Sequence, residues 1–335
     1  MEKLINVAAT VKPERILKDL SKLWIDLAEQ DPNGVLRACA MTLIVVVEEA
    51  HDAAAVGEML AMLMHEHPSR AIVLRVRGGE HPDLDARVFA QCWMPFGRAQ
   101  QICCEEIEIV SSIGSLADVP PVVRGLVAPD LPVVIYCPSE NLWWLRQFQA
   151  LLPLANKLIL DSHGMPNSLR ALAYLDSLKQ NTGLRKADLA WSRLTPWRES
   201  VARIFDEPAR RRAIYDLTEV QILYKNDDEP ASAYYLAAWF MHVLGAGVKL
   251  NIAPGVGPEF ASIARIGLIG PRLEASVELM DTSTVEVRVN GEREQVNVYP
   301  QMTEYEALRH ELAVADRDPV FEDVLGLARL LKGDQ

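Results

Sequence analysis

The sequence predicts an α/β protein with an N-terminal mixed, largely parallel sheet covered by helices, followed by a smaller α+β domain with mostly antiparallel strands. Residues 131–138 and 157–161 are short apolar runs rich in branched side chains, which is typical of strands buried on both faces. Residues 141–152, between these runs, have the length and the apolar stripe of a helix. Together the three segments predict a strand–helix–strand unit with a right-handed crossover. In the C-terminal half the apolar runs are shorter and alternate with polar residues, which indicates antiparallel strands.

Helices and strands alternate through the first half of the chain. A helix at residues 13–29 is expected from the spacing of Ile16, Leu20 and Leu23, which places these side chains on one face. The run at 100–110 alternates isoleucine with glutamate, so we expect a half-exposed antiparallel strand there. The remaining elements expected in this half are helices at 53–65, 117–127, 167–178 and 196–205, and strands at 37–47, 69–77 and 85–93.

The composition changes at residues 206–210, a charged stretch that contains a proline. We therefore predict two domains, at residues 1–206 and 207–335. Asn290-Gly291 is the residue pair favoured in two-residue hairpin turns. The elements expected in the second domain are strands at 213–224, 247–252, 262–268, 273–280, 284–289 and 295–299, and helices at 230–244, 303–314 and 319–331.

Charge and hydropathy limit the classes of partner. The net charge of −12, from 46 acidic and 34 basic residues, would repel a phosphate backbone, so no nucleic acid is expected. The three arginines at 210–212 are too few to form a basic patch. No apolar run approaches the ~20 residues of a membrane-spanning helix, and no signal peptide is recognisable, so a cytoplasmic protein with no membrane partner is expected. Five cysteines without a CxxC pattern predict reduced thiols and no structural zinc.

Few residues suggest chemistry. Asp161, Ser162 and His163 follow a predicted strand at the carboxyl edge of the sheet, where they could form either a polar ligand crevice or a capped turn. They cannot form a catalytic triad, because neighbours on a strand point to opposite faces. His65 and His67 lie at a helix end, so a favourable charge there explains them without a metal. Cys103 and Cys104 should point to opposite faces of a strand. Neither a P-loop nor a GxGxxG motif is present, so no nucleotide cofactor is expected.

Trp191, Arg193, Trp197 and Arg198 form a second group of interest. Tryptophan and arginine dominate protein–protein hot spots, because each combines a large contact area with a directed polar group. Pro196 can begin a helix that Thr195 caps, which would hold these side chains in fixed directions. The group is therefore a candidate partner-binding surface. The alternative is that both tryptophans belong to the core at the domain junction.

Several motifs, in this order along the chain, resemble the glucose-6-phosphate dehydrogenase assembly protein family, OpcA. The most specific is at 188–198, where two tryptophans, a proline and two arginines are spaced as in the family. The others are RACAMTL at 37–43, HPSRAI at 67–72, VRGL at 123–126, LPV at 131–133 and DS at 161–162. The resemblance runs from about residue 37 to residue 205 and is looser over the C-terminal half.

This resemblance implies a non-enzymatic protein that binds glucose-6-phosphate dehydrogenase, promotes its active oligomer and activates it allosterically. Such a protein supports the oxidative pentose phosphate pathway and the supply of NADPH, and it needs no catalytic residues, cofactor or metal of its own. The alternative from another class is an enzyme or sensor that binds a sugar phosphate at the sheet edge formed by Asp161, Ser162, His163 and Gly164.

Overall fold

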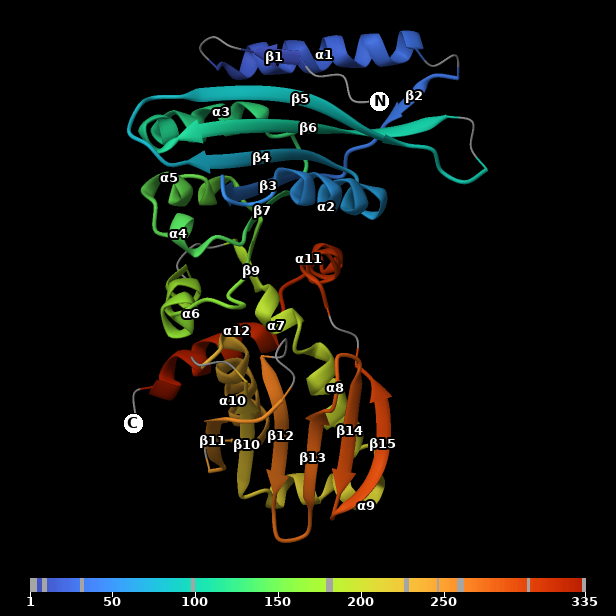
Figure 1. Ribbon diagram of the computed structural model, residues 1–335, viewed down its shortest axis with the longest axis vertical. Coiled ribbons are helices and arrows are strands. Elements are labelled where there is room, and N and C mark those ends of the chain that lie inside the picture. The colour runs from blue at the N-terminus through green and yellow to red at the C-terminus, as the bar shows by residue number, and fades with distance from the viewer. Residues whose placement is uncertain are drawn as a thin grey trace. The chain divides into compact units, whose positions relative to one another are not determined.

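The computed structural model describes residues 5–7, 11–30, 33–97, 100–178, 183–225, 229–245, 247–257, 262–299 and 302–332. The chain divides into two compact units (Figure 1). Unit 1 consists of Met1–Leu160 with Gly183–Lys186, and unit 2 of Asp161–Thr182 with Ala187–Gln335. The chain therefore passes between the units three times, each time before the boundary predicted at residues 206–207. In the described part of the chain no helix is both long and apolar enough to cross a membrane.

Unit 1 is built on a mixed sheet with the strand order β1-β5-β6-β4-β3-β7-β8-β9, and β2 pairs with β6 beside this path. The pairs β4–β6, β3–β4, β3–β7 and β7–β8 are parallel, whereas β5–β6 and β1–β5 are antiparallel. This arrangement confirms the predicted fold class of the first half. The strands are β1 (Ile5–Val7), β2 (Val35–Arg37), β3 (Met41–Glu48), β4 (Ser69–Arg77), β5 (Leu84–Trp93), β6 (Gln101–Ser112), β7 (Val133–Cys137), β8 (Lys157–Leu160) and β9 (Arg185–Asp188).

Helices in unit 1 complete its apolar core. The helix α1 contacts β5 and α3, with its buried stripe formed by Ile16, Leu20 and Leu23 as predicted. Asp52 caps the N-terminus of α2 by accepting a hydrogen bond from the Ala54 backbone N–H at 2.9 Å. The helical segments are α1 (Pro13–Gln30), α2 (Ala53–Glu66), α3 (Val119–Leu126), α4 (Glu140–Trp143) and α5 (Arg146–Gln149), with 3₁₀ turns η1 (Ile113–Asp118) and η2 (Leu152–Leu154).

Two predicted elements of unit 1 are divided in the structure. The strand predicted at 37–47 is two strands, because β2 pairs with β6 whereas β3 pairs with β4 and β7. The helix predicted at 141–152 is interrupted at Leu145, whose backbone is extended. This break allows both Trp143 and Phe148 to be buried, and the Trp143 indole N–H donates to the carbonyl of Cys137 at 3.0 Å.

The prediction that residues 100–110 form a half-exposed strand is wrong. The strand β6 lies between β4 and β5, and Glu105 and Glu106 are only 3% and 8% exposed. Glu105 is satisfied by partners on other elements: it accepts hydrogen bonds from the Trp24 indole at 2.7 Å and from Arg70 at 2.6 Å. Alternation of charged and apolar residues therefore marks ion pairing between neighbouring strands here, where sequence reasoning expected contact with water.

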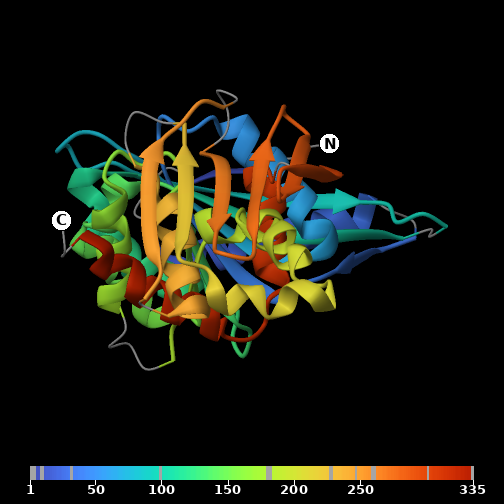
Figure 2. The ribbon, with the colours of Figure 1, turned by 90° about the horizontal axis from the view of Figure 1, so that it is seen from below.

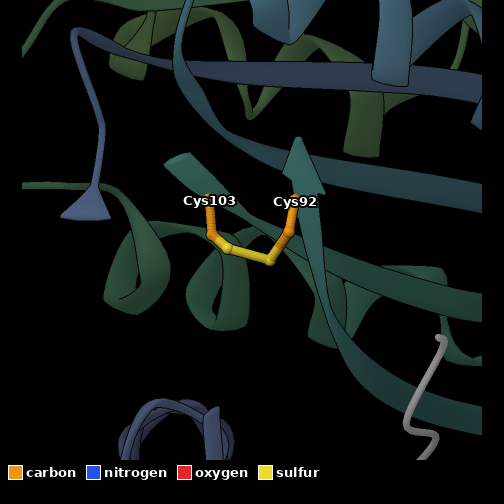
Figure 3. Close-up of a disulfide and its surroundings, with 2 residues drawn as sticks. All are labelled: Cys92 and Cys103. Carbon is orange, nitrogen blue, oxygen red and sulfur yellow. A yellow bond between two sulfur atoms is a disulfide. The ribbon is translucent and has the colours of Figure 1, made fainter. Parts of the chain in front are cut away.

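The hairpin formed by β5 and β6 contains a disulfide between Cys92 and Cys103 (Figure 3). The antiparallel register places these two residues directly opposite each other, with their Cα atoms 4.1 Å apart. The prediction of reduced thiols is therefore wrong for this pair. Cys104 is not joined to Cys103; it is a buried free thiol, and burial raises its pKa to about 11.

Unit 2 contains a second sheet with the order β11-β10-β12-β13-β14-β15. Figure 2 shows β10 and β11 pointing the same way, with β12 running opposite to them. All the other pairs are antiparallel, which confirms the class predicted for the C-terminal half. Asn290 and Gly291, both with positive φ, form the predicted turn between β14 and β15. The strands are β10 (Glu219–Tyr224), β11 (Lys249–Pro254), β12 (Ile263–Ile269), β13 (Glu274–Leu279), β14 (Thr284–Val289) and β15 (Glu292–Val298).

The helices of unit 2 bury the apolar face of this sheet. The helix α10 contacts β10, β11 and α12, and α8 contacts β13. Residues 213–224, predicted as one strand, begin as a 3₁₀ turn, so that only β10 joins the sheet. The helical segments are α6 (Ser168–Ser177), α7 (Leu189–Ser192), α8 (Thr195–Ile204), α9 (Pro208–Arg211), α10 (Ala231–Leu244), α11 (Glu304–Ala313) and α12 (Pro319–Ala328), with 3₁₀ turns η4 (Ala213–Asp216) and η5 (Arg329–Lys332).

Candidate functional site

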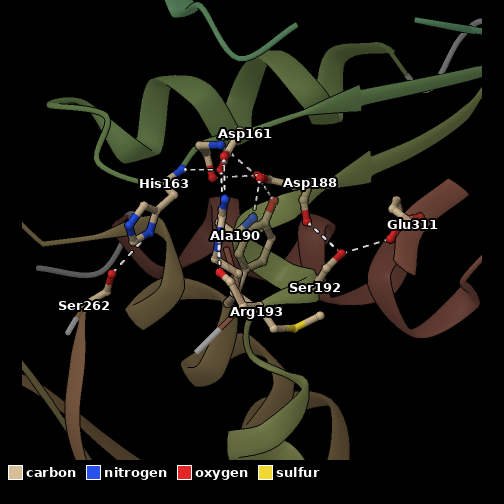
Figure 4. Close-up of polar contacts among 11 residues, drawn as sticks. Asp161, His163, Asp188, Ala190, Ser192, Arg193, Ser262 and Glu311 are labelled. Carbon is tan, nitrogen blue, oxygen red and sulfur yellow. Dashed lines mark hydrogen bonds and ion pairs between the residues drawn. The ribbon is translucent and has the colours of Figure 1, made fainter. Parts of the chain in front are cut away.

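The most connected polar group of unit 2 is the carboxylate of Asp188 (Figure 4). Asp188 ends β9 and caps α7, where it accepts a hydrogen bond from the Ala190 backbone N–H at 3.0 Å. It also accepts bonds from the Ser162 backbone N–H at 3.0 Å, the Ser162 hydroxyl at 2.6 Å and the Tyr235 hydroxyl at 2.8 Å. Because the side chain is fully buried and lies near the Asp161 carboxylate, its pKa is raised, although the bonds from Ser162 and Ala190 oppose this change.

Asp161, directly after β8, is held by Arg193 from the end of α7. Two guanidinium nitrogens of Arg193 donate to the two carboxylate oxygens, at 2.7 and 2.9 Å. The Nε atom of Arg193 donates to the Met302 carbonyl at 3.3 Å, and Asp161 accepts a further bond from the His163 backbone N–H at 3.1 Å. The guanidinium of Arg193 is thus already bound within unit 2 and is not available to an anionic ligand.

His163 lies on the surface and faces Ser262. The Nδ1 atom of His163 is 3.2 Å from the Ser262 hydroxyl oxygen. Packing against the protein disfavours its cation, and Arg193 repels it, so the pKa of His163 is lowered despite the attraction of Asp161. The imidazole and the Ser162 hydroxyl have different partners, because that hydroxyl donates to Asp188. The structure therefore places Asp161, Ser162 and His163 in a capped turn whose side chains diverge.

Trp191 and Arg198 lie face to face within unit 2. The guanidinium carbon of Arg198 is 3.6 Å from the centroid of the Trp191 ring. The Trp191 indole N–H donates to the Asp318 carboxylate at 3.0 Å, and the ring packs against Tyr235 at a centroid distance of 5.9 Å. Burial lowers the pKa of Arg198 to about 10. Trp191 is 4% exposed, so its indole contributes to the core of unit 2.

Trp197 points elsewhere in the same unit. Its ring packs on Tyr299 at a centroid distance of 5.6 Å, and the side chain is 2% exposed. The four residues predicted as a partner surface are therefore not one exposed cluster. Trp191 and Arg198 stack together, Arg193 binds Asp161, and Trp197 packs on Tyr299, the residue that follows β15. The two arginines, which are partly exposed, remain the members that a partner could reach.

Several residues of this network could not be found by local sequence reasoning. Tyr235, Glu311 and Asp318 come from α10, α11 and the start of α12, far along the chain from α7. Asp318 carried one local signal, since it precedes Pro319 and caps α12 through the Phe321 backbone N–H at 3.0 Å. Its second bond, to Trp191, depends on tertiary packing alone. The same is true of the bond from the Ser192 hydroxyl to Glu311 at 2.9 Å.

A hollow of about 490 Å³ lies on unit 2 between α8, α11 and the last two strands. Its lining includes Arg203, Tyr299, Arg309 and His310, but also the carboxylates Glu199 and Glu306. The mixture of charges gives it no clear ligand preference.

Among the residues that the structure describes, no three His, Cys, Asp or Glu side chains gather as a metal ion would require. His65 stacks on Trp93, with ring centroids 4.8 Å apart.

The solved structures that match the chain do so only distantly. An NAD binding oxidoreductase from Klebsiella pneumoniae has a TM-score of 0.49 at 10% identity and covers 87% of this chain and 95% of its own. A biliverdin reductase from Synechocystis sp. has a TM-score of 0.48 at 10% identity and covers 85% of this chain and 95% of its own. Likeness at this level says nothing about the chemistry of the chain.

Sequence comparison is more specific. Two proteins named OpcA, from Synechocystis sp. and Nostoc punctiforme, are each 30% identical to the chain, over 193 and 183 residues. The matches cover 57% and 52% of this chain but 40% and 37% of the relatives, so the chain spans about two fifths of their length. The family model for the glucose-6-phosphate dehydrogenase subunit N-terminal domain matches residues 61–177, and that for the C-terminal domain of the subunit matches residues 185–325. The chain therefore belongs to the OpcA family of glucose-6-phosphate dehydrogenase assembly proteins.

Proposed function

We propose that this protein is a non-catalytic partner of glucose-6-phosphate dehydrogenase that binds the enzyme, promotes its active oligomer and activates it allosterically. The observation that carries the proposal is the match of both domains of the dehydrogenase subunit family, in order, to residues 61–177 and 185–325. In this role the protein acts in the cytoplasm and supports NADPH supply through the oxidative pentose phosphate pathway. Its partner is a protein, with no part for nucleic acid or membrane.

The carboxyl edge of the sheet in unit 1 supports a role without a nicotinamide cofactor. In open α/β sheets ligands bind where the strand order reverses, which here is between β3 and β7. A dinucleotide site requires a glycine-rich loop there, with free backbone N–H groups at the start of the next helix. Here β3 ends with Glu48, and Glu49 follows it directly. Two carboxylates at that position would repel a pyrophosphate.

The helix that follows β3 is also not available to a phosphate. Asp52 occupies the N-terminus of α2 with its own carboxylate, which bonds the Ala54 backbone N–H. Cations near this edge are engaged: Arg77 contacts Glu49 at 2.9 Å, and Arg75 donates to the carbonyl of His51 at 2.9 Å. At this edge a dehydrogenase would hold its cofactor. Here the charged residues bind one another instead, which favours a role in holding the fold together.

The network around Asp188 supports the same proposal. Its ionisable members bind one another, and the serine hydroxyls are donors to carboxylates rather than nucleophiles beside a base. A sugar phosphate at the edge of Asp161 would have to compete with that carboxylate for Arg193. Within unit 2 the network therefore joins the turn at Asp161 and Ser162 to α7 and α10.

A reconstitution experiment tests the proposal. The purified chain is mixed with the dehydrogenase of the same organism, and particle mass and the rate of NADP⁺ reduction are measured against enzyme concentration. We expect a larger enzyme assembly and a higher rate at low enzyme concentration, with no turnover by the chain alone. Unchanged mass and rate would overturn the proposal. Turnover of a sugar phosphate by the chain alone, lost in Asp161→Asn, would establish the enzymatic alternative instead.

A further inference from the structure

The β5–β6 hairpin continues past the end of the parallel sheet. The strand β4 pairs with β6 only from Glu105 to Ser112. Beyond Glu105, residues 102–104 pair with β5 on one side, and β2 adds a short parallel ladder from Gln101 to Cys103 on the other. This end of the hairpin, with β2 beside it, projects from the rest of unit 1 in Figure 1. We call residues 91–97 together with Leu36 the hairpin arm.

The hairpin arm is braced although it adds little to the core. The disulfide between Cys92 and Cys103 links the arm to β6, and Trp93 stacks on His65 at the end of α2. Arg37 anchors the adjacent β2, since it contacts Glu105 at 2.7 Å and lies over the Trp24 ring at 5.5 Å. A two-stranded extension is marginal on its own, so these links are what hold the arm in one conformation.

The braced end presents apolar side chains to solvent. Phe96 is fully exposed, and Met94 and Leu36 are each half exposed. Met94 and Phe96 follow β5, and Leu36 lies opposite Ile102 in the register of β2 with β6, so all three belong to the same end of the unit. Large apolar side chains gathered on a rigid support are typical of protein contact sites, because little conformational entropy is lost when they bind.

We propose that the hairpin arm docks into an apolar pocket of the dehydrogenase, with Phe96 as its anchor. This inference rests on the proposed function and adds the surface through which it operates. A lipid surface is a poor match, because the chain carries a net charge of −12 and residues 91–97 of the arm include no basic side chain. An apolar pocket on a protein needs no such charge.

The test compares Phe96→Ser with the full-length wild type in binding to the dehydrogenase. We expect the Kd to rise by about 30-fold, which corresponds to loss of a hot spot. The matched control is Tyr215→Ser, which removes an exposed aromatic side chain from unit 2 and should leave the Kd within about twofold. Both variants should melt at the wild-type temperature, because neither side chain is buried.

A second variant tests the brace. Removing the disulfide with Cys92→Ser and Cys103→Ser leaves the apolar side chains in place but frees the arm, so we expect the Kd to rise by about 10-fold, mostly through slower association. Equal binding by wild type and Phe96→Ser would overturn the inference while leaving the proposed function intact. Failure of the wild type to bind would instead remove the proposed function.

Two other results would assign the arm to a different occupant. If wild type is a dimer by light scattering and Phe96→Ser is a monomer with unchanged dehydrogenase binding, the arm joins two copies of this chain. If wild type, but not Phe96→Ser, sediments with vesicles of phosphatidylcholine and phosphatidylserine, the arm is a lipid anchor. Either result overturns the proposal.

Discussion

Arg193 binds Asp161 through two parallel hydrogen bonds, 2.7 and 2.9 Å long, that join α7 to the turn after β8. Both side chains are mostly buried, with 16% and 11% of their surfaces exposed. An Arg–carboxylate pair of this geometry fixes direction as well as distance. It is one of the contacts that hold the motif at residues 188–198 in a defined conformation.

Replacing this arginine should therefore weaken unit 2. We expect Arg193→Ala to lower the free energy of unfolding by about 3 kcal/mol, because Asp161 would be left partly buried without its counter-charge. The control is Arg203→Ala, which removes an exposed pair with Glu199 and should cost less than about 1 kcal/mol. Urea denaturation followed by tryptophan fluorescence measures both values. Equal stability of the two variants would show that the pair contributes no more than a surface contact.

The double variant Arg193→Ala with Arg198→Ala separates the two interpretations of the residue group at 191–198. Because Arg193 binds Asp161 and Arg198 covers the Trp191 ring, we expect the variant to melt several degrees lower than the wild type. If the variant instead keeps its melting temperature and activates the dehydrogenase less, by about 2 kcal/mol or more in binding, the arginines form the partner surface. Melting curves and activation assays on the same preparation distinguish these outcomes.

Because the pKa of Asp188 is raised in the folded protein, the free energy of unfolding should depend on pH. A carboxyl group whose pKa is raised on folding stabilises the fold when protonated, and this contribution is lost as the pH rises from the unfolded pKa through the folded one. Relative to Asp188→Asn, which does not titrate, wild type should therefore lose stability above about pH 4. Ser162→Ala removes a donor to the ionised form, so it should move that loss to higher pH. Unfolding free energies between pH 4 and 8 provide the measurement, and parallel curves for wild type and Asp188→Asn would contradict it.

Glu105 should be essential to unit 1 although its strand was predicted to be half exposed. Its carboxylate is bonded by Trp24 and Arg70 in a buried position. We expect Glu105→Ala to cost about 3 kcal/mol or more, because Arg70 would remain buried without its carboxylate. Glu58→Ala, on the exposed side of α2, serves as a control with little effect. A variant of Glu105 as stable as this control would show that water replaces the lost partner.

Limited proteolysis examines the boundary predicted at residues 206–210. The exposed Arg211 and Arg212 offer trypsin a site there, but β10–β15 and α8 lie in one unit, and Arg210 is paired with Glu294 on β15. We therefore expect a nicked chain whose fragments stay together on gel filtration. Fragments that separate and remain folded would place the domain boundary at residues 206–210.

Local patterns in the sequence were sufficient for much of the architecture. The runs that became β7 and β8 were found because both faces are apolar, and the turn at Asn290 and Gly291 was found because few other residue pairs adopt positive φ. Glu105 and the Cys92–Cys103 pair were misjudged for the opposite reason. Their environment is set by partners in other elements or by strand register, which no local periodicity encodes.

The site was less predictable than the fold. Asp188 and Asp318 cap α7 and α12, which is a local role, but each carboxylate also binds a side chain from a distant helix. A cap and a tertiary ligand have the same sequence signature. The motif at residues 188–198 identified the family, whereas the direction of its tryptophans, toward the interior of unit 2, depends on α10, α12 and the strand β15.

The capping of Ser162 and Ala190 by one buried carboxylate affects how these amides exchange with solvent. Neither N–H belongs to a strand ladder, so amides in such positions would ordinarily exchange their hydrogens rapidly. Here each is bonded to a carboxylate that water does not reach, and release requires Asp188 to leave Tyr235 as well. Deuterium uptake at these two positions should therefore follow the opening of unit 2 as a whole, which makes them reporters of its integrity outside any strand ladder.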